Sequence, residues 1–372
     1  MDIITHLNEL SGDEAMALRA VVNRLRAMSE RSPAPDLTSR ILKAVKAERS
    51  HKKTRAFHFA PWYSAAAVAV IMLAGWLWLR IAPADGDSGD PSPATLAWLA
   101  AAQEPDGTWS PARHGGAEAY RPALTALSAL ALASAPGNQY RTNVQRACDA
   151  LVRAQSDDGA FGGKGRALYY NQAITTYALA SLYTHTPCPR PVIERALAFM
   201  CARQSLEGGW DYEEGTGGNA AVTAWHVRAL ACMAQQDFSA ADIPLRKALR
   251  WLRGTARDDG SIAYHHSSIT RSESLNALAA HALITGGAAY PQLVALGKRI
   301  SATLTGGDTA TDSGADCYRD YAKILALEAA GSAQAADKIR ARMFDRDTDS
   351  QDQWEMVGGS LYTTALTALA AH

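Results

Sequence analysis

The sequence predicts an all-α protein: an α/α toroid of six helical hairpins in two concentric shells, preceded by a short helical cytoplasmic segment and one transmembrane helix. Three observations support this fold class. A glutamine–turn–aromatic motif recurs along the C-terminal three quarters of the chain. Each copy is flanked by two helical stretches, of which the second is rich in alanine. A charge-free apolar run separates the repeats from a basic N-terminal segment.

The repeated motif first reads "QEPDGTW" from Gln103. It returns as "QSDDGAF" from Gln155, "QSLEGGW" from Gln204 and "ARDDGSI" from Ala256, with equivalent glycines 52, 49 and 52 residues apart. Two weaker copies follow before the C-terminus, which makes six units. A unit that cannot bury both of its faces must stack on its neighbours, and six stacked hairpins can close into a ring.

The motif itself has a structural interpretation. Its acidic residue and glycine supply a turn with a positive φ. The carboxylate or the glutamine can hydrogen-bond exposed amides at a neighbouring helix terminus, and the aromatic ring can stack on a glutamine of its own or the next repeat. We therefore expect Asp106 and Trp109 to fasten one hairpin to the next, and we do not expect them to form an active site.

These units resemble the QW repeats of squalene–hopene cyclases and the related repeats of protein prenyltransferase β subunits. The closing "GGSLYTTALTALAAH" is similar to the last helix of small bacterial squalene-cyclase-like repeat proteins. The resemblance covers residues 94–372, our predicted toroid domain, and implies a central cavity near the N-terminal ends of the inner helices. Position within the repeat selects the candidate ligand-binding residues: His114, Tyr120, Arg121, Tyr169, Tyr170, Asn171, Asn219, Trp225, His226, His265, His266, Arg271, Tyr318 and Tyr362.

A membrane anchor precedes the repeats. Residues 60–79 contain no charged side chain, and 20 residues are about the length of a helix that crosses a bilayer. We predict a transmembrane helix over 60–81 in contact with the lipid bilayer, then a linker over 83–93. Basic residues precede the span and "PADGDSGDPSP" follows it, so the N-terminus should be cytoplasmic. We expect a single-pass inner membrane protein with a periplasmic toroid.

Residues 1–55 carry two amphipathic helical patterns. The run "PAPDLTSRILKAVKAERS", leading into a single span, resembles the cytoplasmic part of bacterial anti-sigma factors, although the His/Cys zinc motif of one subgroup is absent. The resemblance implies a sigma-factor-like protein partner for this segment, and a plain cytoplasmic tail is the alternative. Lys and Arg together number 37, as do Asp and Glu, so overall charge does not point to a nucleic-acid partner.

Known chemistries of the resembled families match poorly. The Asp-x-Asp-Asp acid motif of triterpene cyclases is absent. "GADCYRDY" keeps Cys317 and Tyr318 of the zinc prenyltransferase motif, but Ala315 replaces its aspartate and Gly359 stands where the family histidine should be. We therefore expect no metal and no cofactor. The five cysteines are scattered, and we expect them to be buried free thiols.

Three functions remain open at this stage. We favour an extracytoplasmic toroid that binds a hydrophobic or isoprenoid ligand, or a partner protein, with the cytoplasmic helices anchoring it or acting as an anti-sigma-like regulator. The alternative is an isoprenoid- or lipid-modifying enzyme, of terpene-cyclase or prenyltransferase type, with acid catalysis by Asp316, Asp320 or Glu273. A scaffold whose centre is filled by side chains is the third.

Overall fold

The computed structural model describes residues 93–371, apart from 163–164, 166, 187, 213–216, 267, 269–271, 306–315 and 345–354. They belong to one compact unit, Asp87–His372. The predicted cytoplasmic segment, transmembrane helix and most of the linker lie outside the described residues. Among the helices that are described, none has the length and apolar character needed to cross a bilayer.

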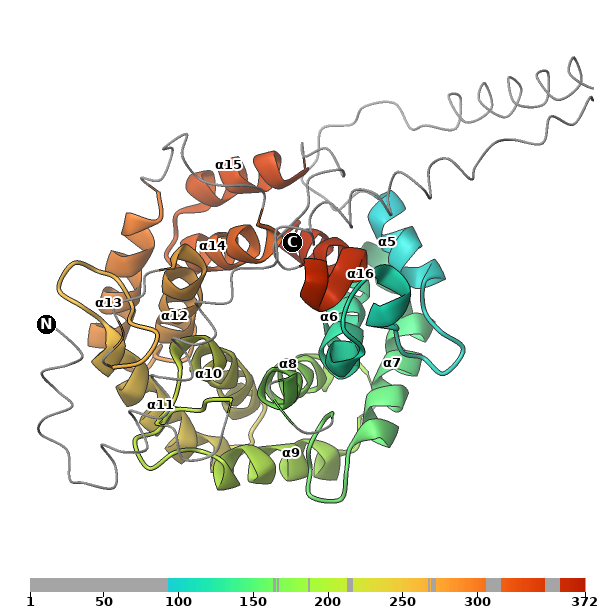
Figure 1. The fold of residues 1–372 in the computed structure, drawn as a ribbon, viewed down its shortest axis with the longest axis horizontal. Coiled ribbons are helices and arrows are strands. Elements are labelled where there is room, and N and C mark those ends of the chain that lie inside the picture. The colour runs from blue at the N-terminus through green and yellow to red at the C-terminus, as the bar shows by residue number, and fades with distance from the viewer. Residues whose placement is uncertain are drawn as a thin grey trace, which may run out of the picture. The chain divides into compact units, whose positions relative to one another are not determined.

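The described chain is all-α, with twelve α-helices that alternate between an outer and an inner shell (Figure 1). The outer helices are α5 (Pro93–Ala101), α7 (Arg141–Ala154), α9 (Arg190–Ala202), α11 (Asp242–Thr255), α13 (Pro291–Thr303) and α15 (Ala333–Phe344). The inner helices are α6 (Arg121–Ala133), α8 (Ala167–Leu182), α10 (Ala220–Gln235), α12 (Glu273–Thr285), α14 (Cys317–Ala329) and α16 (Glu355–Ala370).

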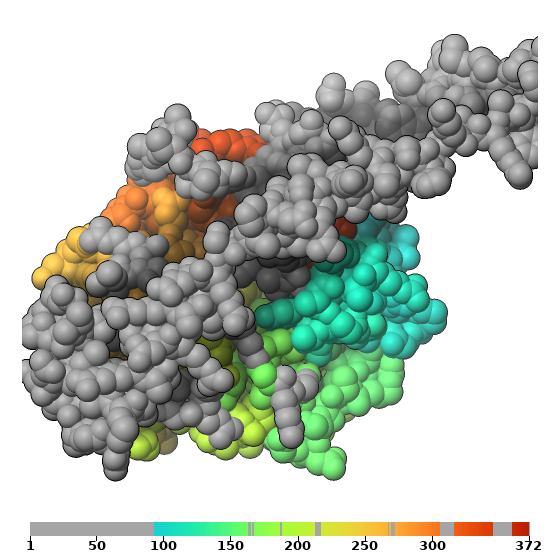
Figure 2. All heavy atoms as spheres, viewed as in Figure 1, coloured from blue at the N-terminus to red at the C-terminus, as the bar shows by residue number. Residues whose placement is uncertain are grey.

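The inner helices form a closed ring. Each one contacts the next, from α6 through α8, α10, α12 and α14 to α16, and α16 contacts α6. The predicted toroid-like arrangement of hairpins is therefore present. Figure 2 shows the same view with all atoms, in which the blue-green to yellow-green atoms of α5 to α9 pack against one another.

Composition explains which helices are inside. Helix α10 buries nearly every side chain from Ala220 to Met233, because alanine and threonine let neighbouring backbones approach on several sides. Outer helix α7 instead buries a single stripe that includes Val144, Ala147 and Leu151, and its other face is polar. Helices buried all round are thus enclosed by amphipathic helices.

The glutamines of the first three motif copies join one hairpin to the next. Gln103 Nε2 donates to the carbonyl oxygen of Gly107 (3.0 Å) in its own turn and to that of Asn143 (2.9 Å) in the first turn of α7. Gln204 does the same with Gly208 and with Pro244 of α11, both at 2.9 Å. The glutamine therefore binds carbonyl groups, whereas the sequence interpretation had it binding amides.

The motif glycine permits close contact with the next outer helix. Gly159 has φ +91°, and a Cβ placed on it would lie 2.2 Å from the carbonyl oxygen of Arg195 in α9. Gly107 and Gly208 have the same sign of φ and the same kind of overlap, with α7 and α11. Both the turn and the neighbouring backbone therefore require glycine at this position.

The motif aromatic closes its own hairpin. Trp109 Nε1 donates to the Leu99 carbonyl of the preceding outer helix (2.8 Å), and its backbone N–H donates to Thr125 Oγ1 of the following inner helix (3.2 Å). Trp210 repeats this arrangement with Met200 and Thr223. The glutamine and glycine reach the next hairpin, and so does Asp106, whose carbonyl oxygen accepts Nη2 of Arg153 in α7 at 2.9 Å. Of the two residues predicted to fasten the hairpins, only Trp109 makes these contacts within its own hairpin.

The prediction that all cysteines are buried is wrong. All five are free thiols, but Cys201 is exposed and Cys232 and Cys317 are partly exposed. Cys148 is buried, and burial raises the pKa of its thiol to about 12.

Candidate functional site: the interior of the ring

A cluster of tyrosines lies near the N-terminal ends of the inner helices. The Tyr212 hydroxyl is 3.3 Å from the Tyr170 hydroxyl and 3.0 Å from that of Tyr264. Asn219, the N-cap of α10, donates through Nδ2 to the Tyr264 hydroxyl and to Asp211 Oδ1, both at 3.2 Å. Burial, with the nearby Tyr318 as the next cause, holds the pKa of Tyr170 well above its usual value. This cluster is a connected network of neutral hydroxyls around one carboxylate.

Aromatic side chains then meet across the ring. Trp225 Nε1 of α10 donates to the Tyr318 hydroxyl of α14 at 3.2 Å, although α12 separates these helices along the ring. The Tyr318 ring centroid is 6.3 Å from that of Tyr362 on α16, and the Tyr177 and Trp225 centroids are 6.5 Å apart. At this depth the ring interior is occupied by aromatic side chains from four helices.

One cation lies against this aromatic layer. Arg228, three residues after Trp225 on α10, is only 3% exposed. Its guanidinium carbon is 4.3 Å from the Trp225 ring centroid, 4.6 Å from that of Tyr177 and 5.9 Å from that of Tyr321. Its Nη2 donates to the Tyr321 hydroxyl at 3.3 Å. Three rings thus stabilise the charge through cation–π attraction.

The hydrogen-bonding capacity of Arg228 is not used up. Its Nε and Nη1 are buried and have no hydrogen-bond partner in the described part of the chain, and neither has the buried Nδ1 of His281 on α12. Burial first, and the charge of Arg228 second, hold the pKa of His281 well below 6.5, so its ring is neutral at pH 7. Unpaired buried donors of this kind are costly and rare in folded proteins.

Side chains beside Arg228 remain partly exposed, unlike Arg228 itself. They are Tyr177 and Ser181 on α8, Cys232 on α10 and His281 on α12. The Ser181 hydroxyl and the Cys232 thiol are 3.4 Å apart. Burial raises the pKa of the Cys232 thiol, and the positive charge of Arg228 opposes this effect only in part. Solvent therefore reaches the side chains next to the buried guanidinium.

The comparisons with known proteins agree with this fold. The chain matches the model of the family described as prenyltransferase alpha-alpha toroid domain over residues 20–211 and again over 174–282. Together these matches cover more than half of the sequence. The chain belongs to the prenyltransferase α/α-toroid domain family. No curated protein matches it in sequence.

Solved structures similar to this prenyltransferase-type toroid have diverse activities. An inactive variant of an α-1,6-mannanase from Salegentibacter, bound to α-1,6-mannotriose, has a TM-score of 0.58 at 10% identity, covering 75% of this chain and 96% of that one. An α-amylase from Clostridium perfringens has 0.51 at 9%, covering 77% and 99%. The type II terpene cyclase MstE from Scytonema, bound to merosterolic acid A, has 0.47 at 16%, covering 75% and 94%. Identities this low show the fold alone.

The three candidate acids of this prenyltransferase-type toroid take part in structural contacts. Asp316 is the N-cap of α14, where its Oδ1 accepts the backbone N–H of Arg319 at 2.9 Å. Asp320 Oδ1 lies 3.3 Å from Nε of the same arginine. Glu273 pairs with Lys323 Nζ at 3.1 Å. Each carboxylate thus already binds a cation or a backbone amide.

The candidate histidines pack against tryptophans or loops. His226 stacks on Trp210 with centroids 4.4 Å apart, and burial lowers its pKa to about 4. His114 meets Trp98 edge-on at 5.1 Å, and His266 stacks on Trp251 at 4.9 Å. His265 Nδ1 lies 2.8 Å from the Gly218 carbonyl oxygen and 3.7 Å from Asp211 Oδ2.

The remaining candidates divide between the ring interior and local contacts. Tyr170, Trp225, Tyr318 and Tyr362 lie together in the interior, as described above. Asn171 Nδ2 donates to the Ala119 carbonyl (2.7 Å). Three others lie near helix starts. Tyr120 is the N-cap residue of α6, and Tyr169 is buried in the first turn of α8. Arg121 donates to Thr108 Oγ1 and forms an ion pair with Glu118. Arg271 lies outside the described residues.

Sequence reasoning missed the residues that surround the cation. Arg228 follows Trp225 by three residues, Tyr321 follows Tyr318 by three, and Tyr177 follows Tyr170 by seven. Helical periodicity places residues at these spacings on one face, one or two turns further along. The signal was available, but the family analogy directed attention to the N-terminal ends of the inner helices alone.

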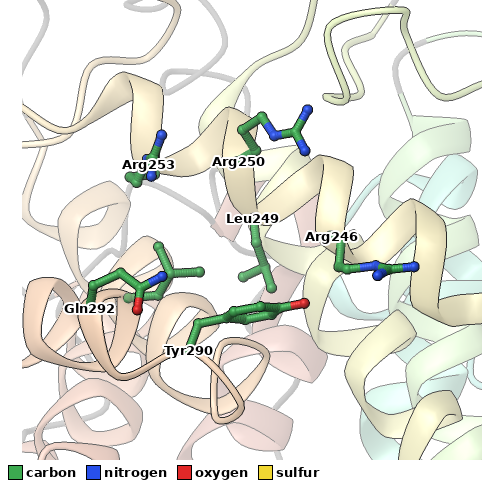
Figure 3. A pocket seen from close by; sticks show the side chains of 7 residues that line it. Arg246, Leu249, Arg250, Arg253, Tyr290 and Gln292 are labelled. Carbon is green, nitrogen blue, oxygen red and sulfur yellow. The ribbon is translucent and has the colours of Figure 1, made fainter.

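A separate hollow of about 230 Å³ lies on the outer surface between α11 and the start of α13 (Figure 3). Arg246, Arg250 and Arg253 border it, beside Tyr290 and Leu249. All three arginines are exposed, so water and salt screen their charges. The ring interior is the stronger candidate site because its polar groups are shielded from solvent.

Proposed function

We propose that this toroid is a binding domain for a hydrophobic ligand of isoprenoid type, and that it does not chemically transform that ligand. The aromatic layer of the ring interior would contact the apolar part of the ligand. Residues 60–81 would tether the domain to the inner membrane, with the toroid on the periplasmic side. The basic residues before this run and the acidic residues after it support the tethering.

One observation carries the preference for binding over catalysis: the candidate acids are already engaged. Protonation of a substrate requires a carboxylic acid held within hydrogen-bond reach of the reacting atom. Glu273 is paired with a lysine, and Asp316 and Asp320 both contact Arg319. The carboxylate of the tyrosine cluster, Asp211, is engaged in the same way, because it accepts Nδ2 of Asn219 at 3.2 Å. Aromatic rings can hold an apolar chain without supplying a proton.

The experiment is a titration of the full chain in detergent micelles with farnesol, followed by tryptophan fluorescence. We expect saturable quenching, and we expect mass spectrometry to recover farnesol unchanged. Trp225→Phe should weaken binding, whereas Trp98→Phe, a change on the outer shell, should not. Absence of saturable binding would overturn the proposal, and so would conversion of farnesol or of its diphosphate into a new product.

We also propose that residues 1–55 bind a sigma-factor-like protein. The support is the pair of amphipathic helical patterns and the resemblance described above. The full chain should copurify with a sigma factor from its host, and a chain lacking residues 1–55 should not. Equal recovery with both chains would contradict this part.

A further inference from the structure

We propose that Arg228 binds the carboxylate of a monoanionic ligand whose apolar body rests on the aromatic layer of the ring. This inference depends on the proposed binding function and adds the chemical class of the ligand. It starts from a buried guanidinium that lacks an acidic partner in the described part of the chain, and from the unused donors Nε and Nη1.

Guanidinium geometry favours an oxoanion. A guanidinium can bind both oxygens of a carboxylate or phosphate along either of two edges, Nη1/Nη2 or Nε/Nη2, and such charge-assisted pairs are among the stronger hydrogen bonds in proteins. Nη2 donates one N–H to the Tyr321 hydroxyl, which fixes the plane of the guanidinium. A carboxylate would then bind along one edge, through Nε or Nη1 together with the other N–H of Nη2. The rings of Trp225 and Tyr177 hold the cation within 4.3 and 4.6 Å of their centroids, so the guanidinium is positioned before a ligand arrives.

The charges around Arg228 indicate a monoanion. Arg228 supplies one positive charge, and His281 beside it is neutral at pH 7. The nearby acid that acts on Tyr321, Glu328, forms its own ion pair with Arg340. A carboxylate would balance the single charge, whereas a phosphate monoester or a diphosphate would bring an excess of buried negative charge.

Neutral groups complete the site. The Nδ1 atom of His281 has no hydrogen-bond partner within the described ranges and can serve a second oxygen of the ligand as donor or acceptor, depending on its tautomer. Ser181 on α8 and Cys232 on α10, both partly exposed, mark the side on which solvent comes nearest to the buried Arg228. The rings of Trp225, Tyr318 and Tyr362 lie nearer the N-terminal ends of the inner helices, and the apolar body of the ligand would pack against them.

The test compares three probes that share one apolar chain: farnesol, farnesoic acid and farnesyl phosphate. Each is titrated into the full chain in micelles at pH 7. Farnesoic acid should bind at least about tenfold more tightly than farnesol, as a charge-assisted pair implies, and more tightly than farnesyl phosphate. Arg228→Met should remove this preference and leave farnesol affinity within about threefold, with folding checked by circular dichroism.

The matched control is Arg203→Met, which changes a partly exposed arginine at the C-terminal end of outer helix α9, where its guanidinium carbon lies 3.8 Å from the Phe199 ring centroid. It should leave the preference intact. Equal affinity for farnesol and farnesoic acid, or preference for the phosphate, would overturn the inference while the proposed binding function stands. If no probe binds, both are overturned.

Discussion

The tyrosine cluster around Tyr212 and the side chains around Arg228 both lie in the interior of the ring. They differ in whether their buried polar groups have hydrogen-bond partners. The hydroxyls of Tyr170, Tyr212 and Tyr264 each have a partner, and Asn219 links Tyr264 to Asp211. Around Arg228 two guanidinium nitrogens and His281 Nδ1 are buried and have no hydrogen-bond partner among the described residues. The first cluster resembles the interior of any folded protein, and the second does not.

The difference separates groups that hold the ring together from groups kept for a ligand. A satisfied buried network stabilises one arrangement of side chains. A buried charge without a partner lowers stability, so a protein that keeps one accepts that cost at a functional position. The variants described next begin with the groups that should contribute most to the free energy of unfolding and end with the group that should contribute least.

The largest effect should come from the motif glycine. In Gly159→Ala the new methyl group would overlap the Arg195 carbonyl, and φ is positive as well. We expect a loss of about 3–5 kcal/mol in the free energy of unfolding, measured by urea denaturation of the full chain. Gly137→Ala is the matched control, since Gly137 also has positive φ but has open space around it, and it should cost about 1 kcal/mol. Similar losses for both variants would refute the crowding argument.

Acid should destabilise the ring because its buried histidines are neutral. His226 has a pKa of about 4 in the folded chain and about 6.5 when unfolded, so the unfolded chain binds the extra proton between these values. Stability is complete above pH 6.5 and falls as pH drops toward 4, by about 3 kcal/mol from His226. His281 acts in the same direction.

Thermal unfolding between pH 7.5 and 4.5 measures this dependence. His226→Phe keeps an aromatic ring against Trp210 but cannot titrate, so its unfolding temperature should vary less with pH than that of the parent chain. An unchanged pH dependence in the variant would show that His226 does not contribute.

The glutamine link should have an intermediate effect. In Gln204→Met the carbonyl groups of Gly208 and Pro244 each lose a hydrogen bond, and the side chain keeps its length. We expect a loss of about 2 kcal/mol by urea denaturation. Gln145→Met changes a partly exposed residue of α7 whose Nε2 donates to Asp149 in the same helix, and it should change stability by less than about 0.5 kcal/mol. Equal effects would mean that the motif does not join the hairpins.

Sequence pattern alone predicted the toroid, because the motif repeats and each copy adds the same evidence. The identity of the joining residues could not be read from one motif, since Gln103, Asp106 and Trp109 all offer hydrogen-bonding groups. Only the structure shows that Gln103 reaches Asn143 in the next hairpin while Trp109 stays with Leu99.

The interior was predicted less completely than the fold. The aromatic residues at the starts of inner helices stood out by position in the repeat, but Arg228 lies in mid-helix within "AWHVRALACM". A lone arginine there is equally compatible with an ion pair on the surface. Its meaning depends on which side of α10 faces the ring and on the absence of an acid beside it, and sequence order states neither.

The unfolding free energy of Arg228→Met, compared with that of Tyr212→Phe, tests the central claim most directly. Arg228→Met removes a buried charge that lacks an acidic partner among the described residues, which is favourable, and it also removes the cation–π contacts, which is unfavourable. Because the first effect offsets the second, the variant should be as stable as the parent chain, or more stable by up to about 2 kcal/mol. Tyr212→Phe breaks a satisfied network and should lose about 1 kcal/mol. A loss of about 3 kcal/mol or more in Arg228→Met would show that the arginine holds the ring together, and would contradict its assignment as a ligand-binding group.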